Sequence, residues 1–210
     1  MRIARSMSEN GVVIGNAFDK YGSRNPIVRY LMRGFETSLR SLVKKAGVRE
    51  IHEVGCGEGY WTLRWLEDGY HVRGSDVSTE VIRLAQMNAR DRGIQADFKI
   101  ASIYDLVPEA DGAELIVCCE VLEHLEHPEL ALHVLQKIAS RFLIISVPQE
   151  PLWRILNLAR GRYCRQLGNT PGHIQHWSKN AFIDLTGRCF EIVDCCTPLP
   201  WTMILAKCKV

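Results

Sequence analysis

The sequence predicts an α/β fold in which a mostly parallel sheet carries helices on both faces. From Arg49 onward, short apolar runs alternate with stretches of helical periodicity, which is the pattern of consecutive strand and helix units. The run from Leu115 to Cys119 is apolar at every position, as expected of a strand that is buried on both faces. With 210 residues, the chain is long enough for one such domain with a large core and does not require two.

The amino-acid composition argues against several classes of protein, including nucleic-acid-binding and membrane-spanning proteins. Hydrophobic residues make up 47% and charged residues 24% of the chain, and the formal net charge is only +2, so no general nucleic-acid signature is present. No apolar run approaches the ~20 residues of a membrane span, and no signal-peptide core follows Met1, so we expect a cytoplasmic protein. The eight cysteines include no C-x-x-C pair, which argues against a zinc ribbon or a thioredoxin-like site.

The first 47 residues predict a flexible arm followed by a helix. Residues 1–23 show no clear period and are expected to be loose. Asn25 followed by Pro26 is typical of a helix start and Gly47 of a helix end, which places the helix within residues 24–47. Apolar residues between these limits keep helical spacing, so one face should pack on the sheet.

A glycine-rich turn follows the first strand of the predicted sheet. The strand Ile51 to Val54 runs into Gly55, Gly57 and Gly59 at alternate positions, and a helix to Glu67 comes next. Glycine allows backbone angles and close approaches that a Cβ forbids, so a ligand can contact the main chain here. The spacing is G-x-G-x-G, whereas a dinucleotide fingerprint requires G-x-G-x-x-G.

An acidic residue at the end of the next strand fits the same site. Asp76 ends the strand that starts at Tyr70 and lies about 20 residues after Gly55, the separation at which nucleotide-binding units place a ribose-binding acid. A carboxylate can accept hydrogen bonds from two vicinal hydroxyls. Because Ser78 is the better N-cap for the following helix, Asp76 is available for a ligand.

The glycine turn resembles the first motif of class I S-adenosylmethionine-dependent methyltransferases, which usually reads E/D-x-G-x-G-x-G. The segment Glu120-Val121-Leu122-Glu123-His124-Leu125, at the end of the fourth strand, is similar to the E-x-L-E-H-L element of ubiquinone-biosynthesis-type O-methyltransferases. The resemblance covers about residues 49–148. It implies a Rossmann-like, doubly wound sheet of seven strands whose last strand is antiparallel, and this agrees with a terminal hairpin predicted for residues 190–196 and 203–209.

The resemblance also implies the cofactor S-adenosyl-L-methionine. Glycine main chain would lie beside its methionine part, Asp76 would bind the ribose, and Val77 and Ile103 would flank the adenine. Ser102 stands where the family often has an acid that receives the adenine amino group, and a serine can still accept one hydrogen bond. The implied cofactor-binding residues are Glu53, Gly55, Cys56, Gly57, Gly59, Asp76, Val77, Ser102, Ile103 and Glu120.

Three interpretations remain open for the segment from Glu120 to His124. If this segment is helical, Glu120, Glu123 and His124 share one face. His124 is then a candidate general base for a substrate hydroxyl, the three groups are candidate ligands for a divalent cation, or they form a purely structural network. We assign no metal from the sequence.

An insertion at residues 149–177 predicts a lid over the site. It is longer than the ~2–6 residues of an ordinary α/β connection and follows the carboxyl end of a strand. A short helix from Pro151 combines an apolar stripe with arginines, which suits a core contact, a peripheral membrane contact or a cover for an acidic or lipid-linked substrate. His173 and His176 in this insertion are rival candidates for the base.

The expected function is therefore that of one methyltransferase domain over residues 1–210. Methyl transfer from S-adenosylmethionine to an oxygen of a small metabolite, or of a sugar- or lipid-linked intermediate, is the main hypothesis. The alternatives are N-methylation of a small molecule, a nicotinamide-dependent oxidoreductase and a non-catalytic binding module. We expect no nucleic-acid substrate, and the sequence leaves the oligomeric state open.

Overall fold

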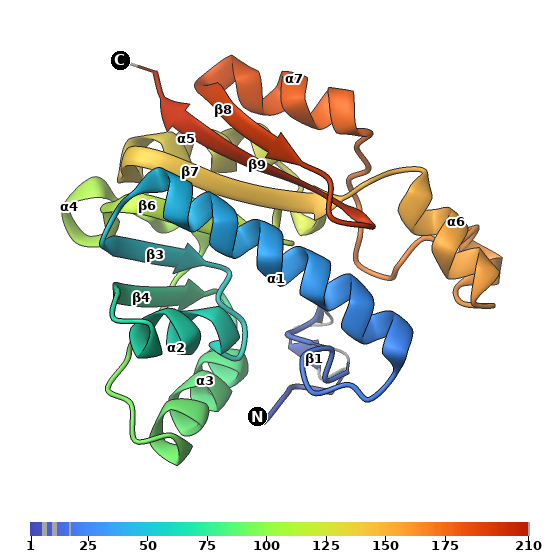
Figure 1. Ribbon diagram of the computed structural model, residues 1–210, viewed down its shortest axis with the longest axis horizontal. Helices are drawn as coiled ribbons and strands as arrows, with labels where there is room; N and C mark the ends of the chain where they lie inside the picture. Colours follow the sequence, from blue (N-terminus) through green and yellow to red (C-terminus); the bar gives the residue numbers. More distant parts are fainter. Residues whose placement is uncertain (6–7, 10–11, 17, 210) are drawn as a thin grey trace.

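A seven-stranded sheet lies at the centre of the molecule in the computed structural model, which describes residues 1–5, 8–9, 12–16 and 18–209 (Figure 1). The strand order is β5-β4-β3-β6-β7-β9-β8, and only the contacts of β9 with β7 and β8 are antiparallel. The strands are β3 (Glu50–Val54), β4 (His71–Asp76), β5 (Asp97–Ile100), β6 (Ala113–Cys119), β7 (Ala139–Pro148), β8 (Phe190–Cys196) and β9 (Trp201–Cys208). The predicted fold class and its terminal hairpin are confirmed.

Helices and short 3-10 turns connect these strands. They are α1 (Pro26–Ala46), α2 (Tyr60–Glu67), α3 (Thr79–Asp91), η1 (Ile103–Asp105), α4 (Pro108–Asp111), η2 (Leu122–His124), α5 (Pro128–Ile138), α6 (Leu152–Ala159), η3 (Cys164–Gln166) and α7 (Lys179–Cys189), and a small hairpin of β1 (Ser8–Glu9) and β2 (Val12–Val13) precedes them. The predicted ends of α1 are confirmed. The Asn25 side chain accepts hydrogen bonds from the first turn, and Gly47 closes the helix in a left-handed conformation.

The continuous apolar run in β6 is explained by two hydrophobic clusters. Leu115 and Val117 pack with residues of α1 and α2 on one face of the sheet. Ile116 and Cys118 pack with residues of α5 and α7 on the other. Successive strand side chains point to opposite faces, so burial of both faces favours apolar residues at every position of the run Leu115 to Cys119.

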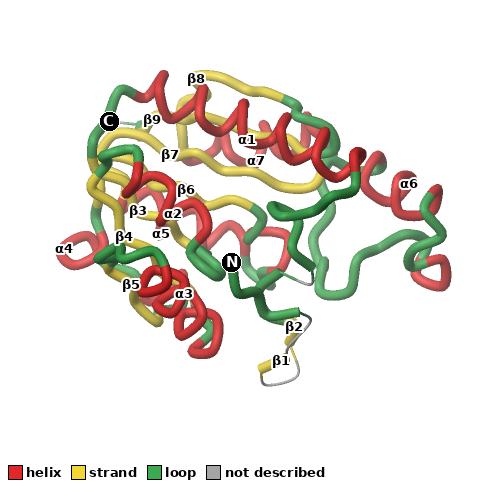
Figure 2. Tube along the Cα trace, turned by 60° about the horizontal axis from the view of Figure 1, so that its bottom comes forward, coloured by secondary structure: helices red, strands yellow, loops and turns green. Residues whose placement is uncertain are grey.

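The carboxyl ends of the parallel strands face one edge of the sheet, which we call the carboxyl edge. The N-terminal segment and α6 both lie beyond this edge (Figures 1 and 2). The predicted insertion is present, since β7 ends at Pro148 and α7 begins at Lys179, and α6 projects from the body of the domain. Within the described part of the chain, no helix is long and apolar enough to cross a membrane.

Candidate active site

The glycine turn joins β3 to α2 with three residues in left-handed backbone regions. Gly55, Gly57 and Gly59 have φ values of 76°, 54° and 80°. The N–H groups of Gly55 and Cys56 donate to the Ser75 carbonyl at 2.8 and 2.9 Å, which fixes the turn against the end of β4. A Cβ added at Gly55 would collide with the Val121 side chain, so this position requires glycine for space as well as for angle.

Asp76 lies directly against this turn. Its carboxylate accepts from the Gly57 N–H and from the Ser78 N–H, both at 3.0 Å. Ser78 caps α3 as predicted, because its hydroxyl accepts from the Val81 N–H. Burial raises the pKa of Asp76, and the backbone donors oppose that rise. Each carboxylate oxygen has a second lone pair, so the contacts made here leave acceptor capacity for a ligand hydroxyl.

Glu53 and Cys56 lie beneath the turn. The Glu53 carboxyl accepts hydrogen bonds from both the N–H and the hydroxyl of Thr62, in the first turns of α2. Burial raises the pKa of Glu53 to about 8, so its neutral form predominates at pH 7. Cys56 is also buried. Both residues support the shape of the turn, and their predicted contact with a cofactor stays a prediction.

The predicted adenine-binding residues lie in different environments. Val77 keeps 69% of its surface exposed beside the turn, so an apolar side chain is open to a ligand there. Ile103 is buried in the hydrophobic cluster behind η1, and the Ser102 hydroxyl caps η1 by accepting from the Tyr104 N–H at 3.3 Å. Their roles toward adenine stay predictions.

The segment from Glu120 to His124 is not one helix, so the shared face that a helix would give Glu120, Glu123 and His124 does not form. Glu120 has a φ of 60°, so the chain turns sharply at the end of β6, and the 3-10 turn η2 includes only Glu123 and His124 of the three. The Glu120 carboxylate accepts from the Ser146 hydroxyl at 3.0 Å and from the Trp201 indole N–H. Burial raises the pKa of Glu120 to about 7.

The structure instead brings Glu123 and His124 together with His173 from the insertion. The Glu123 carbonyl accepts from the N–H groups of Ile174 and Gln175 at 2.9 and 3.0 Å, which ties the insertion to η2. The rings of His124 and His173 meet edge to face with centroids 4.9 Å apart. One ligand atom from each of Glu123, His124 and His173 lies within 4.8 Å of the others. We call these three residues the histidine cluster.

Hydrogen bonding sets the tautomer of His124. Nδ1 lies 2.9 Å from the Gly172 carbonyl, and because a carbonyl only accepts, Nδ1 carries the proton and Nε2 keeps a lone pair. Burial lowers the pKa of His124, and burial together with the neighbouring histidines lowers that of His173 to about 3. Both imidazoles are therefore neutral at pH 7.

The histidine cluster can do two kinds of chemistry. A neutral imidazole with a lone pair on Nε2 can accept a proton from a substrate hydroxyl. Glu123 is 1% exposed, and its Oε2 has no hydrogen-bond partner among the residues that the structure describes, so the cluster also offers a carboxylate and two imidazoles to a divalent cation. His176 lies outside this group of ligand atoms, and its Nε2 lies 2.8 Å from the Asn169 amide oxygen.

Aromatic rings form an apolar wall beside the cluster. Trp153 of α6 stacks on His173 with centroids 5.8 Å apart and lies 5.9 Å from Trp201, which meets Phe35 of α1 at 5.1 Å. Sequence reasoning missed Trp201 and Phe35 as part of this site. The only signal was Trp153 beside the apolar stripe of the predicted lid helix.

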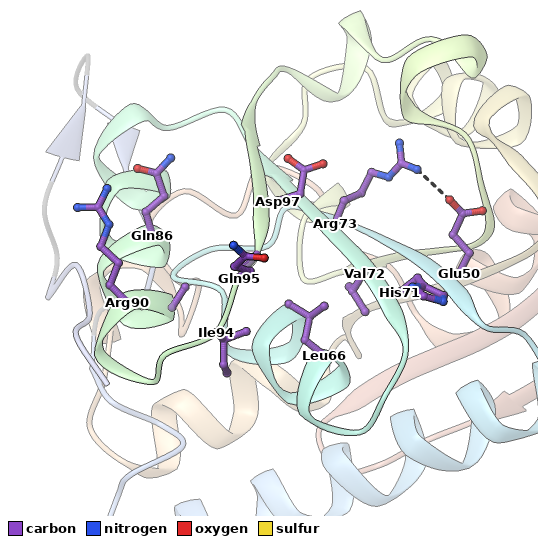
Figure 3. Close-up of a pocket in the computed structure, with 12 residues that line it drawn as sticks. Glu50, Leu66, His71, Val72, Arg73, Gln86, Arg90, Ile94, Gln95 and Asp97 are labelled. Carbon is purple, nitrogen blue, oxygen red and sulfur yellow. Dashed lines mark hydrogen bonds and ion pairs between the residues drawn. The ribbon is translucent and has the colours of Figure 1, made fainter.

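A separate groove of about 910 Å³ lies at the opposite edge of the sheet (Figure 3). Glu50, His71 and Asp97, which begin β3, β4 and β5, line it, and Arg73 reaches Glu50 across it. Open α/β sheets bind ligands outside the carboxyl ends of their strands. The groove at the amino ends is therefore distinct from the candidate active site.

Comparisons with known proteins agree with this geometry. Residues 51–141 match the family described as a methyltransferase domain. A ubiquinone biosynthesis O-methyltransferase from Xanthomonas euvesicatoria is 26% identical over 165 residues, which cover 70% of this chain and 68% of that protein.

Among solved structures, magnesium protoporphyrin IX methyltransferase from Synechocystis, solved with bound SAH, has a TM-score of 0.68 at 21% identity and covers 92% of this chain and 94% of its own. An N-methyltransferase from Bradyrhizobium japonicum has a TM-score of 0.64 at 18% identity and covers 86% of this chain and 97% of its own. At these identities the two structures support the fold alone.

Proposed function

We propose that this chain, which matches a methyltransferase domain over residues 51–141, uses S-adenosylmethionine to methylate an oxygen of a small metabolite or of a sugar- or lipid-linked intermediate. The observation that carries the proposal is the free Nε2 of a neutral His124 at the carboxyl edge, beside Glu123 and His173. The nicotinamide alternative is set aside because the matching domain is that of methyltransferases.

The glycine turn and Asp76 hold the cofactor in this proposal. Main chain at Gly55 to Gly59 lies beside the methionine part, Asp76 accepts from the ribose hydroxyls, and exposed Val77 covers one side of the adenine. S-adenosylmethionine supplies an electrophilic methyl group when bound. The protein then needs to align donor and acceptor and to exclude water, since the displacement requires no covalent intermediate.

His124 removes the acceptor's proton in this proposal. A hydroxyl is a poor nucleophile until its proton leaves, and Nε2 of a neutral imidazole can accept that proton as the methyl group arrives. The Gly172 carbonyl holds the ring through Nδ1, so the lone pair keeps one direction. A carboxylate acceptor would need no base. A requirement for His124 would therefore distinguish a hydroxyl acceptor from a carboxylate acceptor. The Xanthomonas relative is named an O-methyltransferase, and this supports an oxygen acceptor.

The lid and the aromatic wall favour an acceptor with apolar surface. Trp153 and Trp201 present rings beside the histidine cluster. Ile155 and Leu158 of α6 are 55% and 40% exposed, and the exposed Arg160, Arg162 and Arg165 lie near them in the sequence. Exposed apolar residues next to cations suit an interface with anionic lipid. A lipid-linked acceptor could then reach the site without leaving its membrane.

Methyl-tritiated S-adenosylmethionine incubated with the purified full chain and a fractionated cell extract tests the proposal. We expect label in the small-molecule or lipid pool, and we expect hot hydriodic acid to release it as volatile methyl iodide, which marks an O-methyl group. Label that stays bound to nitrogen would replace the proposal with N-methylation. Binding of the cofactor with no transfer to any pool would favour a non-catalytic module.

A further inference from the structure

Glu58 stands in the middle of the glycine turn, yet its side chain is directed toward the N-terminal segment. The residue is 1% exposed. Its Oε1 accepts from the Ala4 N–H at 3.0 Å and from the Asn16 N–H at 2.7 Å, and its Oε2 accepts from the Asn16 side-chain amide. Three N–H donors from a segment that precedes the fold therefore bind one buried carboxylate.

Further contacts hold the same segment on α3. Asn88 accepts from the Arg2 N–H at 2.7 Å and donates to the carbonyls of Arg2 and Glu58, each at 3.0 Å. Ala4 and Ile14 form a small hydrophobic cluster with two residues of α3. The flexible arm expected for residues 1–23 falls partly outside the described residues, but its described residues make specific contacts. We call residues 2–5, 14–16 and 18–21 the N-terminal strap.

Gly15 allows the strap to approach the glycine turn. It has a φ of 59°, and a Cβ added there would lie 2.6 Å from Glu58 Oε1 and 2.9 Å from the Ala4 Cβ. A side chain at this position would both strain the backbone and push the strap away from Glu58. The contact between the strap and Glu58 therefore requires glycine at position 15, both for its backbone angle and for space.

The strap ends by placing two side chains against the candidate active site. The Tyr21 ring stacks on Tyr60 with centroids 3.5 Å apart, and its hydroxyl accepts from the Trp61 indole N–H at 3.0 Å. Burial raises the pKa values of Glu53, Glu120 and Glu123, and the Lys20 ammonium opposes that rise in all three. Lys20 therefore brings positive charge to the buried carboxyl groups between the glycine turn and the histidine cluster.

We propose that Glu58 and Asn16 latch the N-terminal strap across the glycine turn, so that the strap closes the cofactor pocket and must detach before the spent cofactor leaves. The inference rests on the proposed placement of the cofactor. The position of the strap and the burial of the Glu58 carboxylate support it. The strap lies beyond the carboxyl edge where a ligand enters (Figure 2), and detaching it exposes a carboxylate that loses three hydrogen bonds.

The dissociation rate of S-adenosylhomocysteine from the full-length chain tests the latch. The rate is measured by stopped-flow displacement with excess S-adenosylmethionine, in wild type and in Glu58→Gln. The variant removes the negative charge that strengthens all three hydrogen bonds, and it replaces Oε2 with an amide donor, so the Asn16 side chain must turn over to keep its contact. We expect dissociation to be about 10-fold faster, which corresponds to about 1.4 kcal/mol. Gly15→Ala is a second variant that opens the strap by collision and should act in the same direction.

Glu80→Gln is the matched control, because Glu80 pairs with Arg83 on the exposed surface of α3 and does not contact the strap. Hydrogen exchange at residues 2–5, 14–16 and 18–21 gives a second readout. We expect S-adenosylhomocysteine to slow exchange there in wild type and to slow it less in Glu58→Gln. Wild type that binds the compound, with dissociation and exchange unchanged in both variants, would overturn the latch alone. Wild type that does not bind it would overturn the proposed function as well.

Discussion

The two halves of the carboxyl edge are built in different ways. We call the side proposed to bind the cofactor the cofactor half and the side proposed to bind the acceptor the acceptor half. The cofactor half consists of main chain from one short segment, Gly55 to Gly59, and of Asp76 from the adjacent strand. The acceptor half forms only when the insertion folds back, since His124 and Gly172 are 48 residues apart in sequence and are joined by one hydrogen bond. Local backbone geometry therefore fixes the first half, whereas a long-range contact fixes the second, and changes in one half should leave the other largely intact.

Substitution of Gly55 should have a large effect on the cofactor half and leave the acceptor half intact. In Gly55→Ala the new Cβ collides with Val121, and the residue is held at a φ of 76°. We expect the affinity for S-adenosylmethionine to fall about 100-fold, or roughly 3 kcal/mol, when it is measured by titration calorimetry. Gly69→Ala is the control, because Gly69 has a φ of 86° but open space around its Cβ position. That variant should lose stability and keep its affinity.

Substitution of His124 should affect only the acceptor half. We expect His124→Gln to lower kcat by about 100- to 1000-fold while the cofactor affinity changes less than about twofold, because a glutamine cannot take up a proton. His176→Gln is the control, since His176 lies outside the histidine cluster. The pKa of His124 is lowered from its ordinary 6.5, so the neutral, active form dominates from pH 7 upward. Wild-type kcat should therefore be constant above pH 7 and fall only as the pH drops through the lowered pKa of His124.

Two results would contradict this role of His124. A kcat for His124→Gln equal to that of wild type would remove the base from the mechanism. Loss of wild-type activity on dialysis against a chelator, with recovery on addition of Mg²⁺ or Mn²⁺, would instead assign Glu123, His124 and His173 to a divalent cation. With the imidazole acting alone, we expect the chelator to leave the rate unchanged.

Substitution of an exposed residue of α6 should have a smaller effect, on binding to lipid vesicles rather than on catalysis. We expect Ile155→Asp on α6 to weaken cosedimentation with phosphatidylglycerol vesicles about fivefold, because it replaces an exposed apolar side chain with an anion. Leu130→Asp on α5 is the matched control, since Leu130 is 56% exposed and Ile155 is 55% exposed. Equal binding by both variants, or equal binding of wild type to phosphatidylcholine vesicles, would argue against a lipid contact through α6.

Substitution of Glu53 should affect stability rather than rate. Its pKa rises from 4.5 to about 8 on folding, so its contribution to stability is complete below pH 4.5 and is lost as the pH rises through 8. In the ligand-free chain, Glu53→Gln should therefore be more stable than wild type by about 5 kcal/mol at pH 9, with little difference at pH 4.5. Chemical denaturation at the two pH values measures this. A difference that does not depend on pH would show that folding leaves the pKa of this carboxyl unchanged.

The same contrast explains what sequence reasoning could predict. The strand, glycine turn and helix around Gly55 follow from local residue types, and the run Leu115 to Cys119 follows from burial on both faces. The helical face expected for Glu120 to His124 failed because the turn at Glu120 is imposed by tertiary contacts with Ser146 and Trp201. The pairing of His124 with His173 has no local signal, since it depends on how a long insertion folds back.

A crystal structure of the full chain with S-adenosylhomocysteine tests the central claim most directly. The account predicts the homocysteine part against main chain at Gly55 to Gly59, the ribose hydroxyls on Asp76, and the sulfur facing the side of the site where His124 lies. Density for the compound in the groove lined by Glu50, His71 and Asp97, or anywhere else away from the carboxyl edge, would contradict it.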